Sequence, residues 1–132
     1  MFSFHCRFRL QSPPNLRRRQ RQLLDAHPDG ARNQIEGGIQ QAASWTLLEE
    51  LRIHDGEVVT TTWADYPIAT FQDIPREIAV IFRAEEDAVS TGVGEVGTVP
   101  TAAAIANAVY DACGARVRRL PLVPSAVAAA RV

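Results

Sequence analysis

Apolar residues recur at helical spacing in a first stretch, which predicts an α-helix from about Asn33 to Arg52. Asn33 is a suitable N-cap residue, and Glu36 three positions later completes a capping-box pattern. The preceding residues, 25–32, combine proline, aspartate and glycine, as turns do. The apolar stripe of this predicted helix consists of Ile35, Ile39, Ala42, Ala43, Thr46 and Leu47.

A second helical stripe follows Pro100, which suits the first turn of a helix, and Gly114 supplies the predicted end. Between the two helices, β-branched residues predict a strand over 57–62, and the apolar run 78–83 predicts a second, buried strand. Residues 116–120 offer a third short strand. We therefore predict an α+β fold, with two main helices packed on a small β-sheet. The second stripe contains Ile105, Ala108, Val109 and Ala112.

Two adjacent glycines, Gly37 and Gly38, interrupt the first predicted helix. Each glycine costs a helix roughly 1 kcal/mol relative to alanine, so we expect something to pack very close to the backbone there. The residues alone leave open whether this is another element of the chain or a ligand.

Residues 92–97 fit the pattern G-x-G-x-x-G and precede the second helix. A dinucleotide-binding turn is not favoured, because that motif needs a strand directly before it and an acidic residue about 20 positions later. Glu95 is more informative, since a glycine-flanked backbone can bring its carboxylate close to a ligand, as a general base requires. The alternative is a solvated loop glutamate.

The charges are distributed unevenly along the 132 residues. Residues 1–24 contain six arginines and no acid, whereas the rest contains eight arginines and 15 acids. The basic head is either an arm for nucleic acid or another anionic surface, or a disordered or mistranslated terminus. Because no aromatic residue lies among the arginines at 17–21, we expect no nucleic-acid partner. The 46% apolar and 22% charged residues are typical of a globular domain.

Cysteine and histidine usage predicts no metal ligands in this chain. Cys6 and Cys113 are too few for a disulfide framework or a zinc site, and His5, His27 and His54 lack ligand spacing. No apolar run is long enough for a membrane span, and the first residues do not form a signal peptide. We leave the compartment open between cytoplasm and periplasm.

Two separated motifs carry a family resemblance. The first reads QIEGGIQQ at 34–41 and LEEL at 48–51. The second reads GVGE at 92–95, followed by PTAAAIANAV at 100–109. In this order and spacing they resemble the molybdopterin-binding large subunit of the xanthine dehydrogenase and aldehyde oxidase family, the molybdenum hydroxylases.

The resemblance extends from about Pro28 to the C-terminus and is nearest to the isoquinoline 1-oxidoreductase beta-subunit type, on the segments 33–38 and 63–68. Residues 1–24 match nothing in that family. The family's large subunit is also several times longer than this chain, so its other cofactor contacts and its substrate pocket have no counterpart here.

The resemblance implies a molybdopterin lying against the first helix. Gln34 matches a glutamine that hydrogen-bonds the pterin, and close approach of the cofactor would account for Gly37 and Gly38. Gly94 and Val96 complete the cofactor-binding set that it implies. The bacterial type suggests the cytosine dinucleotide form of the cofactor.

Glu95 matches the family's active-site base beside the molybdenum. In this family, water supplies the oxygen that is inserted into an aldehyde or N-heteroaromatic carbon. The electrons leave through iron–sulfur clusters on another subunit or domain, so we expect none in this chain.

We therefore predict two regions: a basic head over 1–24 and a C-terminal segment of a molybdopterin-binding domain over 25–132. This segment is expected to carry the active-site glutamate and to be inactive alone. Its expected partners are the remainder of the large subunit, a small iron–sulfur subunit and a small-molecule substrate. The alternative is a non-catalytic binding or assembly module derived from the same fold.

Overall fold

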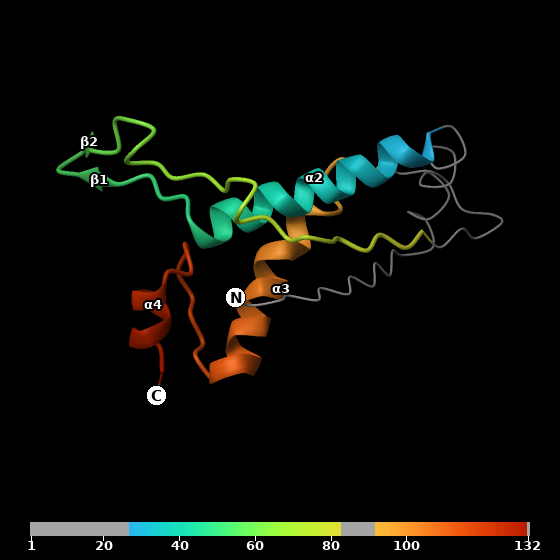
Figure 1. Cartoon of the computed structure of the whole chain (residues 1–132). Helices are drawn as coiled ribbons and strands as arrows, with labels where there is room; N and C mark the ends of the chain where they lie inside the picture. The colour runs from blue at the N-terminus through green and yellow to red at the C-terminus, as the bar shows by residue number, and fades with distance from the viewer. Residues whose placement is uncertain (1–26, 83–91, 132) are drawn as a thin grey trace. The chain divides into compact units, whose positions relative to one another are not determined.

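The computed structural model describes residues 27–82 and 92–131 (Figure 1). The elements in chain order are α2 (Pro28–Leu47), β1 (Ile53–His54), β2 (Glu57–Val58), α3 (Thr98–Cys113) and α4 (Pro124–Ala129). The predicted α+β class, with two main helices and a small sheet, is confirmed. The predicted basic head over 1–24 lies outside the described residues.

Helix α2 begins five residues before the predicted start, because Pro28 occupies its first turn and His27 acts as its cap. The His27 Nδ1 atom accepts a hydrogen bond from the Gly30 N–H at 2.9 Å, and the His27 carbonyl accepts one from Ala31 at 3.1 Å. Asn33 therefore lies inside the helix, and its predicted role as N-cap is wrong. Proline, aspartate and glycine are turn residues, but the first turn of a helix tolerates them as well.

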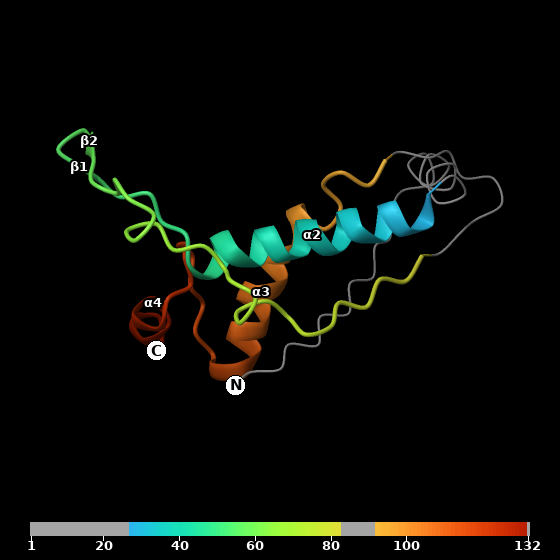
Figure 2. The same cartoon turned by 45° about the horizontal axis from the view of Figure 1, so that its top comes forward.

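The same helix ends at Leu47, before the predicted end at Arg52. The N–H groups of Leu48 and Glu49 both donate to the carbonyl of Ser44, at 2.9 and 3.4 Å, which closes the last turn. Despite its two internal glycines, α2 is one unbroken helix (Figure 2).

The sheet is a two-stranded antiparallel hairpin of β1 and β2, in which Ile53 pairs with Val58 and His54 with Glu57. Its turn is Asp55–Gly56, with φ angles of 50° and 84°. Two successive positive φ angles are typical of the hairpin turns that Asp-Gly favours. All four strand residues are exposed.

The predicted strands were assigned wrongly in three places. Of 57–62 only the first two residues form a strand, and no strand forms over 78–82 or 116–120. Ile78, Val80 and Phe82 nevertheless alternate with more exposed residues and pack against the core beside α2. The apolar run is thus partly buried as expected, but it packs against a helix and not against a neighbouring strand.

The chain divides into two compact units, which we describe separately. The first unit comprises Met1–Ile39 and Pro75–Val99, and the second comprises Gln40–Ile74 and Pro100–Val132. The described core of the first unit is made of Ala31, Ile35, Ile39 and Val93, with Ile78, Val80, Phe82 and Val96 packed against it.

An arginine also joins two segments of the first unit. The Arg32 guanidinium donates to the Val80 carbonyl at 3.1 Å and lies 5.5 Å from the centre of the Phe82 ring. The cation–π contact and the hydrogen bond hold residues 78–82 along α2.

In the second unit, α3 ends where Gly114 adopts a φ of 72°, so the predicted glycine stop is confirmed. The helix begins at Thr98, two residues before the predicted first-turn residue Pro100. Beyond α3, the Leu122 N–H donates to the carbonyl of Thr46 at 2.7 Å. The buried residues of this unit are Ala42, Ser44, Thr46, Thr101, Ala115, Pro121 and Leu122.

The second unit also exposes large apolar side chains along 51–71. Trp63 is 81% and Phe71 94% exposed, and the hairpin residues Ile53 and Val58 are 64% and 50% exposed. Apolar side chains that gather on one segment are typical of surfaces that contact another protein. Within the described ranges, no helix is both long and apolar enough to cross a membrane.

Candidate functional site

The two sequence motifs meet in the first unit through a hydrogen bond between a helix side chain and a loop carbonyl. The Gln34 Nε2 atom, on α2, donates to the carbonyl of Gly94 at 3.0 Å across 60 residues of sequence. A carbonyl only accepts hydrogen bonds, so the nitrogen of the side-chain amide must face the loop. Gln34 and Gly94, both singled out from the sequence, are therefore brought together.

Two glycines allow the loop to lie directly on the helix backbone. A Cβ atom placed on Gly97 would lie 2.5 Å from the carbonyl oxygen of Ile35, and one on Gly38 would lie 2.9 Å from the Thr98 Oγ1 atom. Both distances are shorter than real Cβ contacts allow. The close approach predicted at Gly38 is thus made by another element of the same chain.

Gly97 was not recognised from the sequence as a packing residue. It is the last glycine of the G-x-G-x-x-G pattern, whose third glycine permits close packing between a helix and its neighbour in dinucleotide-binding turns. The G-x-G-x-x-G pattern therefore indicated close packing at Gly97, although the dinucleotide binding usually attached to this pattern is not favoured here.

Gly37 and Gly94 differ from these two glycines, because nothing in the described residues requires their lack of a side chain. Both are exposed, and a Cβ on either would meet no atom within 4 Å. Gly37 lies one turn after Gln34, so the two residues share a face of α2. This face offers bare backbone beside a side-chain amide.

Glu95 is displayed by a loop that is anchored on both sides. Val93 is buried in the core and Val96 packs against it, while Gly94 and Glu95 between them are exposed. The Glu95 carbonyl accepts the Val99 N–H at 3.1 Å, which starts the first turn of α3. The backbone is thus fixed while the carboxylate reaches solvent, as a residue that meets a ligand requires.

Within 27–82 and 92–131, no group of three or more His, Cys, Asp or Glu side chains could hold a metal ion. His27 and His54 are both exposed, as expected. Cys113, which is half-buried, donates its thiol to the Val109 carbonyl at 3.1 Å.

A polar cluster in the second unit was missed by sequence reasoning. The Ser44 hydroxyl donates to Glu49 Oε1 and accepts the Ala69 N–H at 2.9 Å, while the Tyr66 hydroxyl donates to Glu49 Oε2 at 2.8 Å. The hydrogen bond to Glu49 raises the pKa of Tyr66 above its ordinary value, and burial and the charge of Glu49 add to the effect. We call Ser44, Glu49, Tyr66 and Ala69 the Ser44 cluster; it fastens residues 66–69 to the end of α2.

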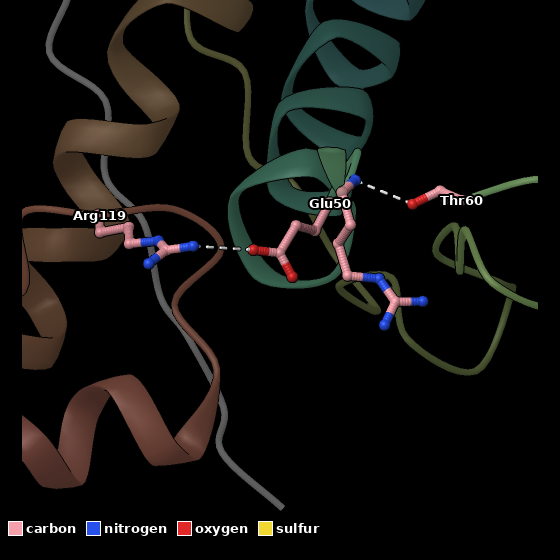
Figure 3. A network of polar contacts seen from close by, with 4 residues as sticks. Glu50, Thr60 and Arg119 are labelled. Carbon is pink, nitrogen blue, oxygen red and sulfur yellow. Dashed lines mark hydrogen bonds and ion pairs between the residues drawn. The ribbon is translucent and has the colours of Figure 1, made fainter. Parts of the chain in front are cut away.

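A second set of polar contacts follows the end of α2 (Figure 3). The Arg119 guanidinium points to Glu50 and forms an ion pair of 3.3 Å, and the Arg52 N–H donates to Thr60 Oγ1 at 2.9 Å. Arg119 is 84% exposed, so water screens the pair and its contribution to stability is small.

Comparison with known proteins identifies the family. Residues 26–75 match the sequence model of the molybdopterin cofactor-binding domain. The chain is 40% identical over 104 residues, or 79% of its length, to one of the subunits of nicotinate dehydrogenase from Pseudomonas putida. It belongs to the xanthine dehydrogenase and aldehyde oxidase family. The beta chain of isoquinoline 1-oxidoreductase from Brevundimonas diminuta is 32% identical over 76% of this chain, so the predicted family resemblance is confirmed.

A solved structure agrees with this assignment. The fold matches quinoline 2-oxidoreductase from Pseudomonas putida 86 with a TM-score of 0.66 and 32% identity over 78% of this chain. The chain spans 9%, 12% and 14% of the lengths of these three relatives. The chain thus corresponds to a small part of each relative.

Proposed function

We propose that this chain forms one wall of a molybdopterin site and supplies Glu95 as the proton acceptor in the hydroxylation of an aldehyde or N-heteroaromatic carbon. The observation that carries the proposal is the hydrogen bond from Gln34 to Gly94. It joins the glutamine expected to contact the pterin to the residue directly before the expected base.

The residues at this wall fit a flat, hydrogen-bonding cofactor. Gly37 and Gly94 leave open space where side chains would otherwise stand, and the Gln34 amide offers a donor and an acceptor beside them. A pterin presents ring nitrogens and a carbonyl, which such an amide can bind. Gly38 and Val96 contribute by holding the loop against α2.

The chain's own chemistry in this proposal is proton transfer. When bound, the molybdenum cofactor supplies the two-electron oxidation and delivers the oxygen derived from water. Glu95 accepts the proton that must leave as the new carbon–oxygen bond forms. A general base has to be held at a fixed place, and the anchors at Val93 and Val96 provide this.

Further protein is part of the proposal, because the relatives are named as subunits and this chain matches a small part of each. We propose that the remainder of the large subunit and an iron–sulfur subunit complete the enzyme, and that the cofactor is the cytosine dinucleotide form. The exposed apolar side chains of 51–71 support a contact with another protein surface.

The test compares Glu95→Gln with Glu77→Gln in the assembled enzyme that contains this chain. Glu77 is an exposed glutamate of the same unit and serves as the matched control. Loss of a general base is expected to slow oxidation of nicotinate, isoquinoline and benzaldehyde by about 100-fold or more, while the molybdenum and pterin contents stay unchanged. Glu77→Gln is expected to retain the wild-type rate.

A wild-type rate in Glu95→Gln would contradict the assignment of the base. If the wild-type assembly itself contained neither molybdenum nor pterin, the non-catalytic module would be the better description.

A further inference from the structure

The contact between Gln34 and Gly94 has a second consequence, which concerns the placement of Glu95. The acceptor belongs to the peptide unit that joins Gly94 to Glu95, so the hydrogen bond acts on the backbone immediately before the carboxylate-bearing residue. Gly94 has no side chain to restrict its dihedral angles, and a Cβ there would meet nothing within 4 Å. The loop therefore needs an external contact at this peptide unit.

The remaining anchors of the loop lie on either side of this point. Val93 is buried before it, Val96 packs after it, and Gly97 contacts the backbone of α2. Between these anchors, Gly94 and Glu95 are both exposed. The Gln34 side chain supplies the contact that reaches the exposed stretch from the helix.

We propose that Gln34 is a positioning residue for Glu95: its amide holds the Gly94–Glu95 peptide unit, and the rest of the same amide faces the cofactor. A glutamine side chain has two amide protons and a carbonyl oxygen, and the contact with Gly94 uses one proton. Among residues 27–82 and 92–131 the amide makes no second hydrogen bond, so the other proton and the oxygen are available to a ligand. The Gln34 side chain thereby links binding of the cofactor to the position of Glu95.

This inference rests on the proposed function for the role of Glu95, but its first test does not. Gln34→Met keeps the length of the side chain and removes the donor, and Gln34→Glu places a carboxylate opposite the carbonyl. The matched control is Gln41→Met, at an exposed glutamine of the same helix. Amide hydrogen exchange is measured on the full 132-residue chain without cofactor.

Loss of this hydrogen bond is expected to loosen the backbone at Glu95, whose carbonyl accepts the Val99 N–H, and so to speed exchange at Val99 by about 2- to 10-fold, with α2 unchanged. Gln34→Glu should have an effect at least as large, because two acceptors then face each other. Gln41→Met should match the wild type. If Gln34→Met lowered the helix content seen by circular dichroism, Gln34→Asn would replace it in the exchange measurement, because the shorter side chain cannot reach the Gly94 carbonyl.

Unchanged exchange at Val99 in the Gln34 variants would overturn the positioning role. In the assembled enzyme, the same role predicts that Gln34→Met lowers kcat more than it raises KM, whereas a role in substrate binding alone would raise KM. If the assembly bound no molybdopterin, the proposed function would fail, yet the exchange result would still decide whether Gln34 positions Glu95.

Discussion

The two units of the chain are stabilised by different kinds of contact. The first unit combines a core of Ala31, Ile35, Ile39 and Val93 with a glycine loop that lies on the backbone of α2. In the second unit, buried residues include Ser44, Thr46 and Thr101, and the Ser44 cluster ties a loop to the end of α2.

This difference shows which of the two units holds its loop most rigidly. Apolar packing and backbone contact tolerate little change in shape, which suits the proposed role of the loop in holding Glu95 at one position. In the second unit, side-chain hydrogen bonds instead fix a long irregular segment, residues 59–74, that has no regular structure to satisfy its backbone groups. Substitutions in the first unit should therefore act through lost or disturbed packing, and those in the second unit through lost hydrogen bonds.

The largest effect is expected from Ile35→Ala in the core of the first unit, where the side chain is 6% exposed. Removing buried methylene groups should lower the free energy of unfolding by about 2–4 kcal/mol. Ile81→Ala is the control, since Ile81 is 75% exposed in the same unit. Chemical denaturation followed by circular dichroism measures both, and equal losses in the two variants would show that the core is not where the structure places it.

Gly97→Ala should cause the second-largest loss of stability, whereas Gly37→Ala should raise stability. The new methyl at Gly97 must displace the Ile35 carbonyl, which should cost about 1–3 kcal/mol of stability. The methyl at Gly37 meets open space in a helix and should add about 0.5–1 kcal/mol. Thermal unfolding of the two variants measures the difference, and the same sign for both would refute the distinction between a packed and an open glycine.

Ser44→Ala is expected to weaken the second unit by about 1–2 kcal/mol, because the Ala69 N–H loses its acceptor and Glu49 loses a donor. Ser125→Ala, at an exposed serine, is the control. Hydrogen exchange at Ala69 should rise in the first variant alone. Protection of Ala69 that survived the loss of Ser44 would mean that the cluster is not what fastens the loop.

The smallest effect concerns the ionisation of Tyr66. Its hydrogen bond to Glu49 raises the pKa of Tyr66, so this stabilisation is fully present below the ordinary tyrosine pKa of about 10 and is lost as the pH rises through the folded value. Glu49→Gln should return the pKa of Tyr66 towards its ordinary value. The chain has two tyrosines, so titration of the phenolate absorbance in a Tyr110→Phe background isolates Tyr66. An identical titration with and without Glu49 would exclude the contact.

Helix periodicity predicted both long helices, because apolar stripes depend on local spacing alone. The stripe of α2 is buried at Ile35 and Ile39, whereas in α3 the buried residue is Thr101 and the predicted stripe residue Ala112 is exposed. The helix ends were harder to place, since Pro28 and Gly30 suit a turn and a first helical turn equally well. The sheet could not be predicted from the apolar run at 78–83, because a segment that packs on a helix can be just as apolar.

The candidate site shows the same limit. The sequence identified Gln34, Gly38 and the loop around Glu95, but it could not show that Gln34 contacts Gly94, which lies 60 residues away. The distinction between packed and open glycines also needed coordinates. Gly38 and Gly37 are adjacent in sequence, yet Thr98 closes off the first and nothing in the described residues closes off the second.

The bare backbone at Gly37 and Gly94 also sets a direction for laboratory evolution of this site. Any substitution of a glycine adds atoms, so a library built at these two positions can only make the opening smaller. Selection there could exclude a bulky group from this face but could not admit a larger one. More room on this face would have to be sought by trimming side chains elsewhere, with these two positions left as they are.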